Sequence, residues 1–404
     1  MNYINIVVYS ILLISVLVGI QIAPKNKLRE DSLSLDAMTS LKGLMAICVI
    51  LHHISQKAAF QQTKTIPIFE HIGFLFVGVF FFCSGYGLYK SFSTKENYLK
   101  GFLKKRVLPI VISYYVMVGI YAIFYLIRQE NFSIDQWICK LTGLTMINSQ
   151  SWYVYVIIIM YIAFYFVFKN EKLRKHGLLI LFLVIIAQGA LFIFLNHFPW
   201  YIGDDGWWKN PSAFGKAPWW KRPCALLFEG EWWVNSTIGF FVGVFIAKNE
   251  KALTEYVEKN YLSCFVITAI SFIAITFVGN YALKNISYWT EFGGNLGMKE
   301  KSICYIIQGF QVVMTILFVV LLMKKVFVKN KFYNFFGKAS LEVYLIQELV
   351  LFSFAFLIEK GNKPIFKYHN YNLAIFAVCV ILCVLIGAII YRWINVSLTK
   401  KLKK

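Results

Sequence analysis

The sequence has little charge for its length, and little of that charge is acidic. Only 15% of the 404 residues are charged, with 41 Lys and Arg against 20 Asp and Glu, whereas an average soluble domain is about 25% charged. The hydrophobic fraction is 59% and the aromatic fraction 18%. A soluble globular domain is therefore excluded. The net charge of +21 lies in short loops between apolar runs, so membrane topology explains it and we expect no nucleic-acid partner.

Several signatures of catalysis and of metal binding are also missing. The chain has no zinc motif, P-loop, dinucleotide fingerprint or nucleophile elbow, so we expect no metal and no nucleotide hydrolysis. None of its eight cysteines forms a Cys-x-x-Cys pair, and six lie inside apolar runs, which indicates buried structural thiols. Cys139 and Cys224 lie in segments that we expect outside the membrane, where a disulfide between them is permitted but not required.

Long uncharged runs dominate what is present. Ile4–Ala23 and Ile303–Met323 carry no charge, and about 20 apolar residues in a helix cross a bilayer. Lipid offers the backbone no hydrogen bonds, so such runs form helices. The first run has neither a basic n-region nor a clear small-residue cleavage site, which favours a retained helix over a signal peptide. The sequence predicts an all-α, polytopic transmembrane bundle of about eleven spans, which begin near Tyr3, Leu41, His71, Leu108, Trp152, Gly177, Val234, Tyr261, Ser302, Ala339 and Leu373.

The basic residues predict the orientation of this bundle. With the N-terminus outside, the inner loops and the C-terminal tail hold 26 basic residues and the outer loops hold 14. An excess of Lys and Arg marks cytoplasmic loops. We therefore expect a multi-pass protein of the cell membrane, with membrane lipid as a partner, the N-terminus outside and the C-terminus in the cytoplasm.

The second expected span carries the most informative polar residues. Lys42 lies at its cytoplasmic entrance, and His53 lies eleven positions further on, about three helical turns and about 16 Å along the axis. The two side chains fall near one face of the helix, whereas His52 points about 100° away from His53. His53 is a candidate general base, although an interfacial histidine without chemistry fits its position equally well. Lys42 is either a topology charge or a ligand for an anion.

Other polar groups at membrane depth are candidates because they are costly there. In the third span, Gly85 permits close helix packing and Ser84 can hydrogen-bond across the gap. The basic run that ends at Arg106 is either a topology signal or an anchor for phosphates. Glu342 and Gln347 lie in an otherwise apolar tenth span and should face the bundle interior or a wet cavity.

The outer segment 197–233 is rich in tryptophan, with seven Trp residues among its charged ones. An interfacial belt on the outer leaflet is one interpretation. A sugar-binding lid is the other, because flat aromatic rings stack on pyranose faces while carboxylates accept hydrogen bonds from hydroxyls. The residues that such a lid would use include Trp219, Trp220, Arg222 and Glu229.

Five short motifs follow one another along the chain. The first is Lys42-Gly43 with His53 ten positions after the glycine. The others are Phe81-Phe82-Cys83-Ser84-Gly85-Tyr86, Arg106-Val107-Leu108-Pro109, Ser151-Trp152-Tyr153, and Gly337-Lys338-Ala339-Ser340 with Tyr344-Leu345-Ile346. Together they resemble the acyltransferase-3 family of bacterial membrane proteins, over about residues 36–394. The chain departs from the family pattern in Lys42, where Arg is commoner, and in Gln347, where many members carry His.

The resemblance implies three parts and one reaction. The parts are an extra N-terminal helix and loop at 1–35, an acyltransferase-3-like membrane domain at 36–394 with a core of about ten spans, and a basic tail at 395–404. The implied reaction moves an acyl group, usually acetyl, from cytoplasmic acyl-CoA to a hydroxyl of an extracytoplasmic glycan. His53 would be the general base or a transient acyl carrier, with Ser84 or Tyr86 donating to the oxyanion. Lys42, with Arg106, would hold the CoA phosphates.

The acceptor side is less specific. Trp152, Glu342 and Gln347 join the outer-segment residues as candidates for binding the glycan. A transporter or flippase for a lipid-linked sugar remains the alternative, since it would use the same polar groups as a pathway rather than as a base. Inverted repeats would favour a transporter, and the sequence shows none.

Overall fold

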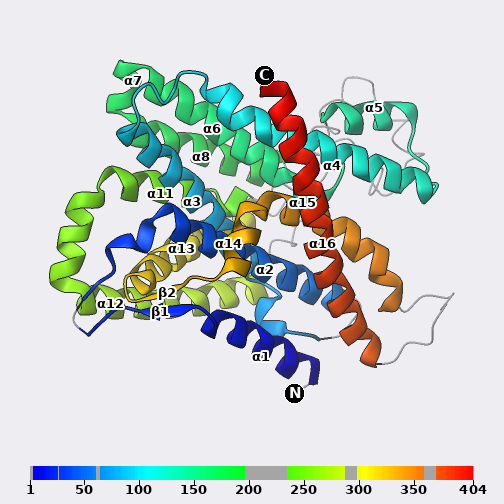
Figure 1. Ribbon diagram of the computed structural model, residues 1–404, viewed down its shortest axis with the longest axis horizontal. Helices are drawn as coiled ribbons and strands as arrows, with labels where there is room; N and C mark the ends of the chain where they lie inside the picture. The colour runs from blue at the N-terminus through cyan, green and yellow to red at the C-terminus, as the bar shows by residue number, and fades with distance from the viewer. Residues whose placement is uncertain are drawn as a thin grey trace. The chain divides into compact units, whose positions relative to one another are not determined.

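The part of the chain that the structure describes is almost entirely helical. The computed structural model of the protein describes residues 3–25, 27–60, 64–144, 146–195, 234–286, 298–358 and 370–403. Figure 1 shows its helices in chain order, with one small pair of strands near the N-terminal helix. The prediction of an all-α bundle is confirmed.

The helices follow the apolar runs of the sequence. The α-helices in the described ranges are α1 (Tyr3–Leu17), α2 (Leu35–Phe60), α3 (Gly73–Thr94), α4 (Leu108–Ile127), α5 (Ile134–Thr142), α6 (Trp152–Lys169), α7 (Glu171–Lys175), α8 (Gly177–Leu195), α11 (Ile238–Lys248), α12 (Glu250–Asn285), α13 (Met298–Met323), α14 (Lys331–Lys338), α15 (Ser340–Phe354) and α16 (Asn370–Lys403). Short helical turns are η1 (Glu30–Leu33), η2 (Pro67–Phe69), η3 (Leu103–Val107), η4 (Ser149–Ser151), η6 (Val234–Ser236) and η8 (Ala355–Leu357).

An apolar helix occupies each of the eleven expected positions. Within the described ranges, 8 helices are long and apolar enough to cross a membrane. Shorter apolar helices at Asn5–Leu17, Gly177–Leu191 and Val234–Lys248 fill the other three positions. In α12 the backbone leaves helical geometry at Asn260, with φ −125° and ψ 25°. This kink separates a charged first part from the apolar run that begins at Tyr261, where the sequence predicts the span.

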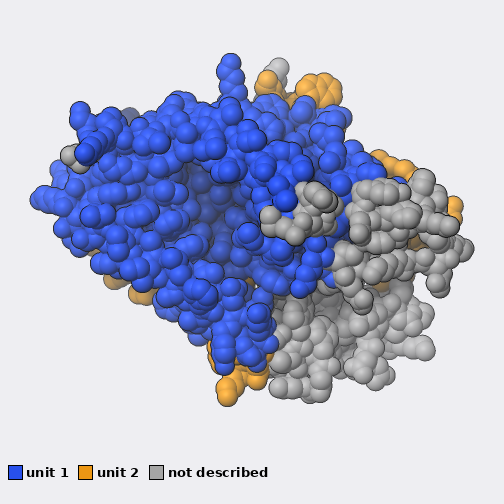
Figure 2. All heavy atoms as spheres, turned by 90° about the horizontal axis from the view of Figure 1, so that it is seen from below, with its two compact units in different colours: residues 1–96, 236–285, 306–392 blue, residues 97–235, 286–305, 393–404 orange. Residues whose placement is uncertain are grey.

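The chain divides into two compact units, which Figure 2 colours separately. Unit 1 comprises residues 1–96, 236–285 and 306–392, and unit 2 comprises 97–235, 286–305 and 393–404. Unit 1 contains α2, α3, α11, α14 and α15, while unit 2 contains α4, α6 and α8.

Glycine contacts hold the helices of unit 1 close together. A Cβ atom built on Gly85 of α3 would lie 2.1 Å from the Phe240 carbonyl oxygen of α11, and one on Gly243 of α11 would lie 2.3 Å from the Phe82 oxygen. Neither distance is compatible with a side chain, so α3 and α11 touch backbone to backbone. The expectation that Gly85 permits close helix packing is confirmed.

A second glycine contact joins α2 to α14. A Cβ on Gly43 would lie 1.9 Å from the Tyr333 oxygen, and one on Gly337 would lie 1.7 Å from the Thr39 oxygen. Gly43→Ala and Gly337→Ala are therefore expected to destabilise the fold by about 1–3 kcal/mol, the usual cost of overpacking. Thermal unfolding in detergent measures this. Gly87→Ala and Gly119→Ala are matched controls, because a Cβ there meets nothing within 4 Å. Equal melting temperatures for all four variants would contradict the close packing.

The N-terminal segment is tied to unit 1 by its backbone and by two Asn side chains. Strand β1 (Ile20–Ile22) pairs antiparallel with β2 (Val326–Val328). Asn330 Nδ2 donates to the carbonyl oxygens of Ser15 and Val18, 3.1 and 3.0 Å away, at the end of α1. Near the start of α1, Asn5 Oδ1 accepts hydrogen bonds from the Ile66 backbone N–H at 2.7 Å and from Thr65 Oγ1 at 3.3 Å. The α1 helix therefore fixes the loop between α2 and α3.

In unit 2 a single aromatic side chain fixes η3 beside α6. Phe102 is buried, and its ring centroid lies 6.1 Å from that of Phe164 and 5.7 Å from that of Tyr165, both on α6. The stacking orients the basic turn that follows, at Leu103–Val107.

Candidate functional site

Lys42 and His53 belong to one uninterrupted helix, α2. The register of an α-helix then places them about 16 Å apart along its axis and within about 20° of each other around it. Both side chains are half-buried. One helix therefore carries both side chains on nearly the same face, as the sequence predicts, with each about two turns from an end of α2. We refer below to the Lys42 end and the His53 end of unit 1.

At the His53 end, Gln56 orients the imidazole. His53 Nδ1 lies 3.2 Å from Gln56 Oε1, one helical turn further along α2. An amide oxygen only accepts hydrogen bonds, so Nδ1 carries the proton when the ring is neutral, and Nε2 is left as the basic nitrogen. Within the described ranges, Gln56 is the hydrogen-bond partner that His53 has. The His53 ring is thus arranged to accept a proton through Nε2.

His52 has a different environment. Its Nδ1 donates to the Phe69 carbonyl oxygen at 2.7 Å, and its side chain is buried. A Cβ on Gly73 would lie 2.1 Å from the His52 ring, so the ring packs directly on the start of α3. The two imidazole centroids are 4.8 Å apart, but the Nδ1 of His52 is held by a backbone carbonyl, whereas the Nδ1 of His53 is held by the Gln56 side chain. The two histidines therefore point into different surroundings, as neighbouring residues on a helix do.

The Lys42 end collects charged residues from three helices. Lys42 interacts electrostatically with Cys83 of α3, Glu342 of α15 and Arg392 of α16. Arg392 Nη1 lies 3.9 Å from Glu342 Oε2, and it also donates to the Lys338 carbonyl oxygen. In the described part of the chain, no hydrogen bond or ion pair holds the Lys42 amine. Two cations and one carboxylate therefore form a net positive cluster with one amine available for an anion.

Sequence reasoning missed Arg392 and Gln56. Arg392 reads as a topology charge in the C-terminal tail, since its contact with Glu342 joins positions 50 residues apart and depends on the packing of α16. Gln56 could have been suspected from the sequence, because it follows His53 by three positions and residues three apart on a helix are neighbours.

Ser84 and Tyr86 lie at the Lys42 end rather than beside His53. Cys83, their neighbour in α3, has its sulfur 4.0 Å from Met38 Sδ of α2, one turn before Lys42. The His52 ring instead meets α3 at Gly73, eleven residues and about 16 Å away from Ser84. Tyr86 donates to Glu250 Oε1 at 2.9 Å, and that carboxylate also pairs with Lys90 at 2.6 Å. The structure therefore does not bring Ser84 or Tyr86 to His53 as oxyanion donors.

Gln347 lies between the two ends. Glu342 faces Lys42, whereas Lys57 near the end of α2 lies 5.1 Å from the ring centroid of Phe352, so α15 runs parallel to α2. Gln347 falls midway along this stretch and is fully buried. Its Nε2 donates to the Tyr344 oxygen at 3.0 Å, and its Oε1 has no hydrogen-bond partner in the described structure. Gln347 therefore leaves one buried acceptor between the Lys42 end and the His53 end.

Two of the remaining predicted site residues belong to unit 2, and the others lie outside the described residues. Arg106 and Trp152 belong to unit 2, where Arg106 is exposed over the Tyr98 ring at 5.5 Å and Trp152 is buried at the start of α6. The outer-segment residues Trp219, Trp220, Arg222 and Glu229 lie outside the described residues, as does Cys224. Cys139 is buried in α5. The structure therefore tests neither the Cys139–Cys224 disulfide that the sequence permits nor the choice between a tryptophan belt and a sugar-binding lid.

The helices and this buried polar interior define a multi-pass membrane protein. The family comparison agrees with the motifs, because the acyltransferase-3 family, an acyltransferase domain, matches residues 35–393. The chain belongs to this family, and its chemistry is acyl transfer. Helix α1 precedes the matched range. No curated protein and no solved structure matches the chain.

Proposed function

We propose that the protein transfers an acyl group, most simply acetyl, from cytoplasmic acyl-CoA to a hydroxyl of an extracytoplasmic glycan across the cell membrane. The observation that carries this proposal is the arrangement on α2, with an unpaired Lys42 amine at one end and a half-buried, Gln56-oriented His53 at the other. In this proposal the thioester donor and the hydroxyl acceptor lie on opposite sides of the membrane. The site must therefore bind the donor near one face and place a base near the other.

The donor would enter at the Lys42 end. CoA is a polyanion, and a lysine amine binds phosphate as a point charge. Arg392 adds a second cation, which its contact with Glu342 holds in place. The extended pantetheine arm would then carry the thioester along α2 toward Gln347 and His53.

The chemical step would take place at the His53 end. His53 Nε2 takes the proton from the acceptor hydroxyl while the hydroxyl oxygen forms a bond to the thioester carbonyl carbon. The C–S bond then breaks, and His53 Nε2 gives this proton to the leaving CoA thiolate, which restores the neutral imidazole. An aliphatic hydroxyl is a poor nucleophile until a base removes its proton, which is why the oriented imidazole is essential to the proposal. Transient acylation of His53 would achieve the same transfer in two steps.

The acceptor class follows from the predicted orientation. The His53 end faces outward when the basic loops are cytoplasmic, so the hydroxyl comes from outside. The tryptophan-rich segment 197–233 follows α8 on the same predicted side, and its rings would stack on pyranose faces. Comparing ester-linked acyl groups on cell-surface polysaccharide from a deletion strain, its parent and a strain complemented with His53→Ala tests the proposal. Loss of the polysaccharide itself, with normal acylation of what remains, would instead indicate a flippase.

The orientation has its own test. The inner loops hold 26 basic residues against 14 in the outer ones, so Lys404 is expected in the cytoplasm and Met1 outside. A reporter fused after Lys404 should be active only if it is of the type that works in the cytoplasm. Activity there of a reporter that works only outside would contradict the eleven-span topology and with it the placement of His53.

A further inference from the structure

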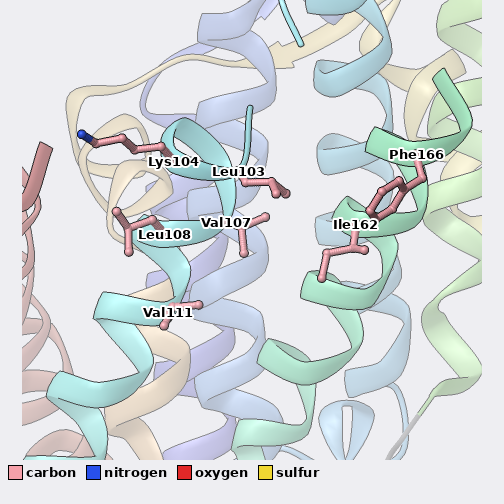
Figure 3. Close-up of a pocket in the computed structure, with 7 residues that line it drawn as sticks. All are labelled: Leu103, Lys104, Val107, Leu108, Val111, Ile162 and Phe166. Carbon is pink, nitrogen blue, oxygen red and sulfur yellow. The ribbon is translucent and has the colours of Figure 1, made fainter. Parts of the chain in front are cut away.

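Unit 2 contains an apolar groove on its surface. The groove has a volume of about 460 Å³ and is lined by Leu103, Lys104, Val107, Leu108, Val111, Ile162 and Phe166. Figure 3 shows the two walls, with the residues of η3 and α4 on one side and those of α6 on the other. Leu103 and Phe166 are 42% and 58% exposed. The groove is therefore open to the surrounding lipid rather than enclosed.

A basic turn lies at one end of this groove. The membrane-spanning stretch begins at Leu103, so Lys104, Lys105 and Arg106 lie where a membrane helix meets water. All three side chains are exposed, and Lys104 extends away from α6 in Figure 3. Across the described ranges, no carboxylate pairs with any of them. The η3 turn is a π-helix, a form that is rare and often found at functional sites.

The turn is held in place on the groove wall. Phe102 is buried against Phe164 and Tyr165, the Arg106 guanidinium lies over the Tyr98 ring, and Lys105 Nζ donates to the Lys100 carbonyl oxygen at 3.3 Å. The aliphatic groove and the cations next to it thus form one fixed surface. Its chemistry is that of an amphiphile with an apolar chain and an anionic head group.

We propose that this groove binds an anionic phospholipid of the inner leaflet, with one acyl chain between α4 and α6 and the phosphate on Lys104 and its basic neighbours. The charge selects the head group, and the groove selects a lipid over free phosphate. Neither Lys42 nor His53 takes part, so this binding is independent of the proposed acyl transfer.

Native mass spectrometry of the purified protein tests this proposal. The protein in detergent is mixed with equal amounts of phosphatidylglycerol and phosphatidylcholine, and retained lipid is counted. Wild type should retain phosphatidylglycerol preferentially. Lys104→Gln should weaken this retention roughly fivefold, as expected for one lysine near an anionic head group. Val107→Trp should fill the groove and remove the tightly held lipid. If Val107→Trp does not fold, Ile162→Trp fills the groove from the opposite wall.

Two control variants separate the groove from general lipid contact. Lys172→Gln removes an exposed cation of α7, and Ile123→Trp adds bulk on α4 at a position that is 61% exposed and outside the groove. Both should retain phosphatidylglycerol like wild type. Equal retention of the two lipids by wild type, or unchanged retention by Val107→Trp and Ile162→Trp, would overturn the proposal.

Discussion

His53→Ala is expected to reduce acyl transfer by roughly 10²-fold or more, which is the usual contribution of a general base. The His53 imidazole is half-buried, Gln56 fixes its tautomer, and Nε2 is the nitrogen left to accept the hydroxyl proton. The measurement is the initial rate of transfer by membranes that contain equal amounts of each variant.

His52→Ala is the matched control, because it removes the same side chain one position away. His52 donates to the Phe69 oxygen and packs on Gly73, so its loss is expected to lower the melting temperature. Transfer per folded molecule should stay within a few-fold of wild type. Gln56→Leu should give a smaller loss than His53→Ala, since the imidazole remains but its tautomer is no longer fixed. Equal losses per folded molecule at His52 and His53 would contradict the assignment of the base.

Lys42→Ala is expected to weaken acyl-CoA binding by roughly 10- to 100-fold, which corresponds to about 1.5–3 kcal/mol for a hydrogen bond to a charged group. The Lys42 amine is half-buried and has no ion pair in the described structure, so we expect it to bind a phosphate of acyl-CoA. Lys42→Arg should keep most of the affinity, because the charge remains and the guanidinium suits phosphate. Titration of acyl-CoA at two salt concentrations measures both effects.

Lys25→Ala separates binding from topology. Lys25 is exposed on the same predicted side of the membrane and belongs to the loop that precedes α2. Its removal lowers the number of basic residues in the inner loops by one, but it should leave acyl-CoA affinity unchanged. Arg392→Ala should behave like Lys42→Ala, because both cations lie at the same end. If Lys42→Ala binds acyl-CoA as tightly as wild type at low salt, Lys42 is a topology charge and the donor site lies elsewhere.

The order of the helices was predictable, because a long apolar run in lipid can satisfy its backbone hydrogen bonds only by forming a helix. Each expected span start coincides with an apolar helix, and Tyr261 follows the kink at Asn260. The relation between Lys42 and His53 was predictable for the same reason, since helical geometry depends only on sequence separation. Gly85 was also identified from the sequence as a close-packing position, and its contact with Phe240 agrees.

The contacts between helices were not predictable from the sequence. Sequence separation gives the position of a residue along its own helix, but not which residues of another helix lie beside it. Ser84 and Tyr86 share a motif with the rest of α3, yet the antiparallel packing of α3 on α2 places them near Met38 and Glu250. Glu342 was assigned to the acceptor side, although it faces Lys42 and Arg392. Only the packing of α15 and α16 in unit 1 shows this.

The central claim is that one protein carries an acyl group from the cytoplasmic face to an outer glycan with His53 as base. Everted membrane vesicles test it directly, because their outer surface is the cytoplasmic face and can be supplied with acetyl-CoA labelled in the acetyl group. Wild type should give labelled ester on glycan inside the vesicles, and His53→Ala should give almost none at equal protein amount. Equal luminal labelling by wild type and His53→Ala would contradict it.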